Sequence, residues 1–136
     1  MNKTAVYRKE HFNAAHRLNN PQLSADENAE LYGKCNNPNY HGHNYEVVVK
    51  VTGDIDLRTG YVTDTKALSQ IIKENITDRL DHKNLNLDVS ELIDTNPTTE
   101  NIAVFIYNSL RNKINPQFDL KIFLYETERN FVEYPA

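Results

Sequence analysis

The sequence predicts one α+β domain, in which a mainly antiparallel sheet of four strands carries two helices on one face. Its 136 residues suit a single hydrophobic core and do not suggest two. Two strand-like patterns come first, two helix-like patterns follow, and two more strands end the chain, without the strand-helix alternation of parallel sheets. The strands also carry apolar residues on both faces, which favours association into a larger sheet or barrel.

The first strand is expected over residues 4–17, where side chains alternate between two faces. His16 ends this strand on its apolar face. A histidine there is more often a hydrogen-bonded core residue than a metal ligand, so His16 alone leaves both interpretations open. The polar segment 18–44 is too long for a hairpin turn, and compact domains rarely keep such loops without a functional reason. Within it, Ser24 and Glu27 match a capping box and predict a helical turn.

The middle of the chain changes from strand-like to helical periodicity. A strand is expected over 45–52, where valines alternate with polar residues, and a short strand over 61–63. Thr63 or Asp64 then provides the N-cap of a long helix. Its apolar residues recur at steps of three and four, which predicts one buried face: Leu68, Ile71, Ile72, Ile76 and Leu80.

A second helix is predicted to begin after Thr98, a typical N-cap residue, and to continue to about Lys113. Glu100 lies in its first turn, where a carboxylate interacts favourably with the helix dipole. Two further strands are expected over 119–128 and 131–134.

Glu126 shares its strand face with Ile122 and Leu124. A carboxylate on an apolar face is costly unless it is compensated. Glu126 therefore lies either at an exposed strand end or beside a cationic or donor-rich partner. The pair Asp81 and His82 follows the first long helix, and by itself it indicates no more than a polar connection.

The segment around His41 and His43 is the richest in chemistry. In an extended segment, side chains two residues apart project to the same side, so both imidazoles could bind one ion. His16 is the candidate for a third ligand, which would leave one position open for water or substrate, as in catalytic zinc sites. Cys35, the only cysteine, could instead be a fourth ligand and close a structural site.

Composition and charge exclude several classes of function. The formal net charge of -4 argues against general binding to nucleic acid or to anionic membranes, since both require a positive field. An anionic ligand would therefore need a local cation. A single cysteine cannot form an internal disulfide, and neither a signal peptide nor an apolar run of membrane-spanning length is apparent. A cytoplasmic protein is expected.

The chain resembles the 6-pyruvoyltetrahydropterin synthases and their relatives, the 6-carboxytetrahydropterin synthases of queuosine biosynthesis. The resemblance covers nearly the whole chain and rests on six separate motifs in order. These are Phe-Asn-Ala-Ala-His at 12–16, Gly-Lys-Cys-Asn-Asn-Pro at 33–38, His-Gly-His-Asn-Tyr at 41–45, Leu-Asp-His-Lys-Asn-Leu at 80–85, Pro-Thr-Thr-Glu-Asn at 97–101 and Tyr-Glu-Thr at 125–127.

The resemblance implies a T-fold, in which a four-stranded antiparallel sheet carries two helices on one side. Trimers of this fold close into a barrel, and two trimers stack into a homohexamer. It also implies one zinc ion per chain, held by His16, His41 and His43. The implied substrate is 7,8-dihydroneopterin triphosphate, whose side-chain hydroxyls zinc would polarise as a Lewis acid.

Further residue roles follow from the same resemblance. Cys35 matches the general base of the family, and Asp81 and His82 match its relay, contributed across a subunit interface. Glu126 matches the residue that receives the pterin edge. The segment that lines the pterin pocket is matched by Thr98, Thr99 and Glu100.

The two branches of the family differ in their product. The pyruvoyl enzymes eliminate triphosphate and keep a three-carbon side chain, whereas the carboxy enzymes also release acetaldehyde. The spacing of segment 24–38 favours the pyruvoyl branch. Other hypotheses are a zinc T-fold protein that binds pterin without turnover and a metal-binding module of another fold.

Overall fold

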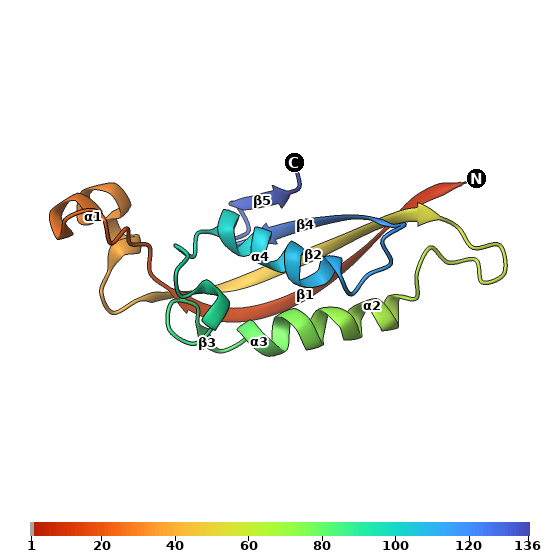
Figure 1. Cartoon of the computed structure of the whole chain (residues 1–136), viewed down its shortest axis with the longest axis horizontal. Coiled ribbons are helices and arrows are strands. Elements are labelled where there is room, and N and C mark those ends of the chain that lie inside the picture. Colours follow the sequence, from red (N-terminus) through yellow and green to blue (C-terminus); the bar gives the residue numbers. More distant parts are fainter. Residues whose placement is uncertain (1) are drawn as a thin grey trace.

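A computed structural model describes residues 2–136. Its sheet has the strand order β3-β1-β2-β4-β5. The two long strands, β1 (Lys3–His16) and β2 (His41–Asp54), pair antiparallel over their whole length and run through the molecule (Figure 1). β4 (Asp119–Tyr125) pairs antiparallel with β2, and β5 (Phe131–Tyr134) pairs antiparallel with β4.

The sheet differs from the predicted one by a short fifth strand. β3 (Lys83–Asn84) pairs parallel with the edge of β1, so the sheet is mixed rather than purely antiparallel. Two residues are too few to produce an alternation pattern, so the sequence could not indicate this strand. The prediction of a strand over 61–63 is wrong, because Val62 and Thr63 form a bend and Tyr61 belongs to no strand. β2 also begins four residues earlier than the expected strand 45–52.

The predicted capping box is confirmed at the start of α1 (Ala25–Tyr32). The Ser24 hydroxyl accepts from the Glu27 backbone N–H at 3.1 Å, and the Glu27 carboxylate accepts from the Ser24 N–H at 3.0 Å. A 3₁₀ turn, η1 (Gly33–Asn36), follows and contains Cys35.

The first long helix begins where the sequence predicted. Asp64 caps α2 (Thr65–Ile72) by accepting from the Lys66 N–H. The helix continues through a π-helical turn, η2 (Lys73–Thr77), into α3 (Asp78–Leu80).

The second long helix, α4 (Thr99–Arg111), also has the predicted N-cap. The Thr98 hydroxyl accepts from the Asn101 N–H, which satisfies one of the donors left free at a helix start. A 3₁₀ turn, η3 (Ser90–Leu92), lies in the connection that precedes it.

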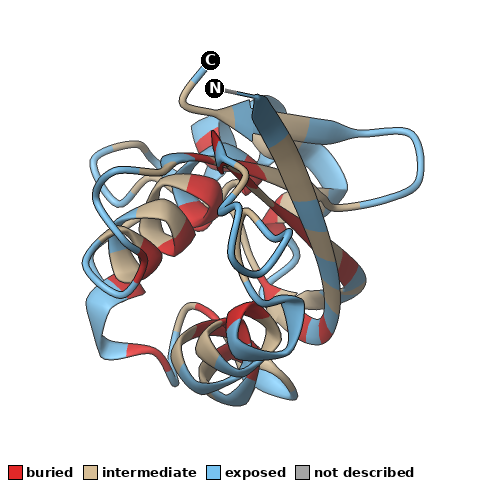
Figure 2. Ribbon diagram, turned by 90° about the vertical axis from the view of Figure 1, so that its right-hand side faces the viewer, coloured by how far each residue is buried: buried red, intermediate tan, exposed pale blue. Residues whose placement is uncertain are grey.

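Both long helices cover the same face of the sheet. One continuous core joins β1, β2 and β4 to α2 and α4, and Figure 2 shows the buried residues between helices and strands. The core includes Phe12, Tyr45, Val47, Val49, Leu68, Ile72, Ile102, Ile106, Ile122 and Leu124. Each such side chain contributes about 1.5–3 kcal/mol on full burial. The opposite face of the sheet is more polar and carries Lys9, His11, Glu46 and Lys50.

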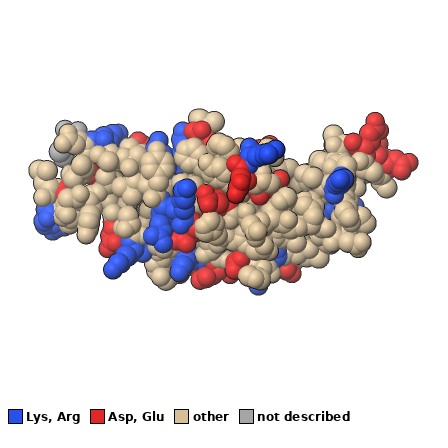
Figure 3. Space-filling view, turned by 180° about the vertical axis from the view of Figure 1, so that it is seen from behind, with Lys and Arg blue, Asp and Glu red and all other residues tan. Residues whose placement is uncertain are grey.

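The surface seen in Figure 3 shows basic and acidic side chains interspersed, with acidic side chains at the end where α1 lies. This helix contributes Asp26, Glu27 and Glu30. Within residues 2–136, no helix combines the length and apolar character needed to span a membrane.

Candidate metal centre and active site

The antiparallel pairing of β1 with β2 brings three histidines together at one end of the sheet. His41 lies directly opposite His16, and His43 follows two residues along β2, so the three side chains share the core face. The ring centroids are 4.6 to 5.1 Å apart, and one nitrogen of each ring lies within 4.8 Å of the others. Among residues 2–136, the group that could hold a metal ion comprises these histidines and not Cys35.

The unpaired nitrogens of the cluster suit a metal ion. Both ring nitrogens of His41 and Nε2 of His43 are buried without a hydrogen-bond partner in the described part of the chain. An unpaired buried polar group costs about 1–3 kcal/mol. Burial lowers the pKa of His16, against the effect of its bond to Pro97, and burial and the adjacent His43 lower the pKa of His41. Neutral imidazoles with free lone pairs are what metal binding requires, so the residues fit this group.

His16 is oriented by the backbone of a distant segment. Its Nδ1 lies 2.7 Å from the carbonyl oxygen of Pro97. A carbonyl oxygen can only accept, so Nδ1 carries the proton and Nε2 presents its lone pair to the cluster. Such a second hydrogen bond fixes the tautomer and the ring orientation of metal-binding histidines.

Glu126 lies just beyond β4 and points toward the histidines. Its carboxylate oxygens are 3.9 Å from Nε2 of His16 and 3.9 Å from Nε2 of His43. One of them accepts a hydrogen bond of 2.8 Å from the Thr99 hydroxyl. The sequence left open whether Glu126 lies at an exposed strand end or beside donor groups. Its side chain is only 24% exposed and lies beside the histidines and Thr99, so the structure favours the second interpretation.

Thr98, Thr99 and Glu100, at the start of α4, line a hollow of about 470 Å³ together with Glu126. The residues predicted to form a pterin pocket therefore come together beside the histidine cluster. Leu18 also lines this hollow, and it lies two residues after His16.

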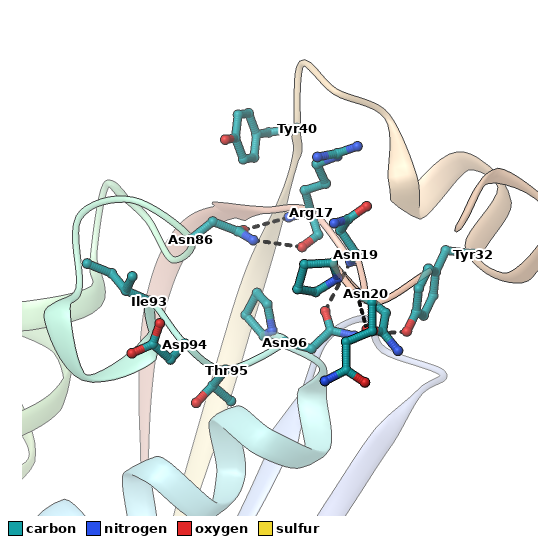
Figure 4. A pocket seen from close by; sticks show the side chains of 13 residues that line it. Arg17, Asn19, Asn20, Tyr32, Tyr40, Asn86, Ile93, Asp94, Thr95 and Asn96 are labelled. Carbon is teal, nitrogen blue, oxygen red and sulfur yellow. Dashed lines mark hydrogen bonds between the residues drawn. The ribbon is translucent and has the colours of Figure 1, made fainter. Parts of the chain in front are cut away.

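A second hollow, of about 520 Å³, lies on polar loops near the ends of β1 and β2 (Figure 4). Two of its lining residues, Arg17 and Tyr40, are chain neighbours of His16 and His41. The Asn86 side chain holds the backbone of Arg17 by accepting from its N–H at 2.8 Å and donating to its carbonyl at 2.9 Å. The sequence did not predict these two hydrogen bonds, because an asparagine in a loop belongs to no periodic pattern.

Cys35 lies in η1, on the loop that connects α1 to β2. Its carbonyl oxygen accepts from the Leu18 N–H at 2.8 Å, which ties this turn to the segment after His16. Its thiol is free and partly exposed. Burial, and then the charges of Glu126 and Cys35, raise the pKa of Tyr45 above its ordinary value.

Asp81 and His82 form a hydrogen-bonded pair at the edge of β1. Asp81 accepts from the Asn13 backbone N–H at 2.8 Å and from Nδ1 of His82 at 2.9 Å. The His82 N–H donates to the Asn13 carbonyl at 2.6 Å, and His82 has a left-handed backbone with φ 61°. The N–H of Asn13, followed by His82, lowers the pKa of Asp81.

This pair is exposed, with 42% of the Asp81 side chain and 83% of the His82 side chain accessible. Within residues 2–136, no hydrogen bond or ion pair connects either residue to Cys35. The structure thus joins two of the three predicted catalytic residues in one chain and leaves the third apart.

Comparison with known proteins agrees with this geometry. The sequence model described as 6-pyruvoyl tetrahydropterin synthase matches residues 5–136. The chain belongs to this family. The 6-pyruvoyl tetrahydropterin synthase resemblance found in the sequence is thereby confirmed.

Individual members of the 6-pyruvoyl tetrahydropterin synthase family are similar over most of their length. The chain is 47% identical to the 6-pyruvoyl tetrahydrobiopterin synthase of Homo sapiens over 129 residues, which cover 95% of this chain and 89% of the relative. It is 46% identical to the 6-pyruvoyl tetrahydrobiopterin synthase of Drosophila melanogaster, and the match covers 93% of this chain and 76% of that relative. The solved structure of Caenorhabditis elegans 6-pyruvoyl tetrahydropterin synthase superimposes on this chain with a TM-score of 0.95 at 38% identity. The match covers 100% of this chain and 97% of that structure.

Proposed function

We propose that this chain is a zinc-dependent lyase that converts 7,8-dihydroneopterin triphosphate to 6-pyruvoyltetrahydropterin and releases triphosphate. The observation that carries the proposal is the cluster of His16, His41 and His43 beside Glu126, in which nitrogens of His41 and His43 are buried without a hydrogen-bond partner. The relatives of 46–47% identity are 6-pyruvoyl tetrahydrobiopterin synthases, which favours this branch over the carboxy branch and over a binding protein without turnover.

His16, His41 and His43 would hold the zinc ion. Three nitrogen ligands with an open fourth position are typical of catalytic rather than structural zinc sites. Zinc bound there supplies Lewis-acid polarisation of the side-chain hydroxyls. The bond between His16 and the Pro97 carbonyl keeps the ring in the tautomer that presents Nε2 to the cluster.

Glu126 would bind the pterin ring. An ionised carboxylate has two acceptor oxygens, which match the paired donors of the guanidine-like pterin edge. The Thr99 hydroxyl donates to one oxygen of Glu126 and so orients the carboxylate before substrate arrives. Thr98 and Glu100 line the same hollow and would enclose the ring.

Cys35 would be the general base, assisted by Asp81 and His82. Only the thiolate accepts a proton, and a neighbouring histidine increases the thiolate fraction at neutral pH. The Asp81 carboxylate holds Nδ1–H of His82, so Nε2 of the same ring is free to face a thiol. Since the pair is exposed and unconnected to Cys35 in one chain, we assign the relay to a neighbouring subunit.

A homohexamer built as a dimer of trimers would create such shared sites. The sheet leaves β3 and β5 as edge strands, and unpaired edges favour pairing with another chain. The more polar face of the sheet would then line the inside of a barrel formed by three subunits.

The experiment that tests the proposal is product analysis with purified protein, zinc and 7,8-dihydroneopterin triphosphate. We expect mass spectrometry to detect 6-pyruvoyltetrahydropterin and triphosphate, and no product after chelation of zinc. Acetaldehyde with 6-carboxytetrahydropterin would assign the chain to the other branch. Binding of pterin without any product would leave only a binding function.

A further inference from the structure

The turn that carries Cys35 is attached to the segment after β1 by the residue that follows the cysteine, Asn36. The Asn36 side chain is buried, and its amide nitrogen donates to the Leu18 carbonyl at 2.7 Å and to Oδ1 of Asn19 at 3.0 Å. The Leu18 N–H donates to the Cys35 carbonyl at 2.8 Å. Both polar groups of the Leu18 backbone are therefore bonded to two consecutive residues of η1.

A third kind of contact joins the same two segments. Nε of Arg17 donates to the Asn36 carbonyl at 3.0 Å, so both the side chain and the backbone of Asn36 bind segment 17–19. The Asn86 side chain also holds the backbone of Arg17, so this segment is anchored independently of the turn (Figure 4). An asparagine amide has two donor hydrogens, and the Asn36 amide has two acceptors within the protein, which leaves no donor for a ligand.

Segment 17–19 adjoins the proposed zinc and pterin sites. It follows His16 directly, and Leu18 lines the hollow that also contains Glu126. A general base must lie within hydrogen-bond reach of the proton that it removes, and an error of about 1 Å in position can cost about a hundredfold in rate. Attachment to this segment therefore sets the position of Cys35 relative to both sites.

We propose that Asn36 is a positioning residue, which holds the Cys35 thiol in the place from which it acts as the base. This inference rests on the proposed function and adds no step to it. The Asn36 amide acts through the backbone of the turn and takes no part in proton transfer.

The kinetic test compares wild type with Asn36→Ala, Cys35→Ala and the double variant. Asn36→Ala should keep its zinc and bind 7,8-dihydroneopterin as wild type does. Its kcat should fall about 10–100-fold with KM nearly unchanged, as for a base displaced by about 1 Å. In the Cys35→Ala background the same change should lower kcat by less than about twofold, because a residue that acts only through the thiol has no effect once the thiol is absent.

Alkylation of Cys35 is a second measurement, and it does not depend on turnover. Cys35 is the only cysteine, so labelling of the native protein by iodoacetamide reports on this turn alone. We expect Asn36→Ala to be labelled at least about threefold faster, because a turn with fewer hydrogen bonds opens more often. Asn108→Ala is the matched control, since Asn108 is exposed on α4 and its side chain forms no hydrogen bond within residues 2–136. It should change none of these quantities.

Unchanged kcat and labelling in Asn36→Ala would overturn the proposal. An equal loss of kcat with and without Cys35 would do the same, because Asn36 would then support the whole site. Wild-type turnover by Cys35→Ala would refute the base and the proposal with it.

If Asn36→Ala does not fold, Asn19→Ala replaces it, because this variant removes one of the two acceptors of the amide. It should give smaller changes of the same kind, and unchanged labelling of Cys35 would count equally against the proposal. Failure of the proposed function is distinct, since wild type itself would then show no turnover. The labelling rates alone would decide in that case whether Asn36 holds the turn.

Discussion

The histidine cluster and the Asp81–His82 pair are the two regions to which we assign the chemistry, and they are built in opposite ways. The register of two long strands sets the histidines, and His16 is 1% exposed. The pair lies at a sheet edge, attached to the backbone of Asn13, with 83% of the His82 side chain accessible.

This contrast in burial indicates which part of the proposed site a single chain can form by itself. A cluster defined by strand register and burial is preorganised in a single subunit. An exposed pair lacks the surroundings that shift pKa values and exclude water, so the proposed relay to Cys35 requires a neighbouring subunit. The following predictions test this division, beginning with the largest effect.

His16→Ala should abolish both metal binding and turnover. Two histidines rarely suffice for a stable zinc site, and the variant also removes the ring that the Pro97 carbonyl orients. We expect stoichiometric zinc to be lost and turnover to fall at least about a thousandfold, because metal polarisation contributes several kcal/mol. Elemental analysis of the purified variant measures the metal.

His11→Ala is the matched control. His11 lies in β1 on the polar face, and 74% of its side chain is exposed, so zinc and turnover should be unchanged. Retention of stoichiometric zinc by His16→Ala would refute the ligand assignment.

Cys35→Ala should separate the two regions, because it removes the proposed base and leaves the histidine cluster complete. We expect full zinc content and unchanged pterin binding, with turnover lower by about 10²–10⁴, the usual contribution of a positioned acid or base. Elemental analysis and turnover are measured on the same sample. If zinc is lost instead, Cys35 is a ligand.

Mixing Cys35→Ala with His82→Ala tests whether the relay crosses subunits. After unfolding and refolding together, random assembly should restore about a quarter of wild-type activity, because a shared site needs one intact residue from each of two subunits. If both residues act within one chain, mixing restores nothing.

Glu126→Gln should weaken pterin binding without loss of fold. A neutral amide offers only one acceptor to the paired donors of the ring. Hydrogen bonds to charged groups contribute about 1.5–3 kcal/mol, so the dissociation constant should rise about 10–150-fold. Titration with 7,8-dihydroneopterin measures it. Glu133→Gln, on an exposed side chain that pairs with Lys121, is the control. Unchanged binding by Glu126→Gln would show that the carboxylate lies beside the histidines without binding the pterin ring.

Local signals in the sequence predicted most of the fold. Alternation located the four main strands, and Asp64 and Thr98 marked both long helices through their capping side chains. The start of β2 at His41 was missed, because the polar residues before Tyr45 show no apolar alternation. Pairing with β1 extends the strand there, and that is a tertiary effect.

The candidate site divides in the same way. The spacing of His41 and His43 predicted two side chains on one face, and the structure places His16 beside them. The hydrogen bond from His16 to the Pro97 carbonyl could not be predicted, because every residue has a backbone carbonyl and the sequence does not show which one lies near His16.

The smallest expected effect concerns Asp81. It measures how much the charge of Asp81 stabilises the attachment of the Asp81–His82 pair to Asn13. The pKa of Asp81 is lowered in the folded chain, chiefly by the Asn13 N–H. A carboxylate with a lowered pKa stabilises the fold above its unfolded pKa of about 3.9, and this contribution is lost as pH falls through the folded value. Asp81→Asn keeps an acceptor for the Asn13 N–H and removes the charge. The variant should therefore be less stable at pH 7, by under about 1 kcal/mol because the side chain is exposed.

The difference between wild type and Asp81→Asn should shrink as pH falls below about 4, because the wild-type carboxylate then becomes protonated and neutral like the amide. Urea unfolding of both proteins at several pH values from 7 to about 2.5 measures it. Asp119→Asn, at a side chain that is 78% exposed, shows how much of any change comes from net charge alone. A difference that grows toward acidic pH would mean that the fold favours protonated Asp81, and the attachment to Asn13 would then not depend on its charge. A difference well above about 1 kcal/mol would show that the pair is buried in the assembled protein, which is what a relay shared between subunits requires.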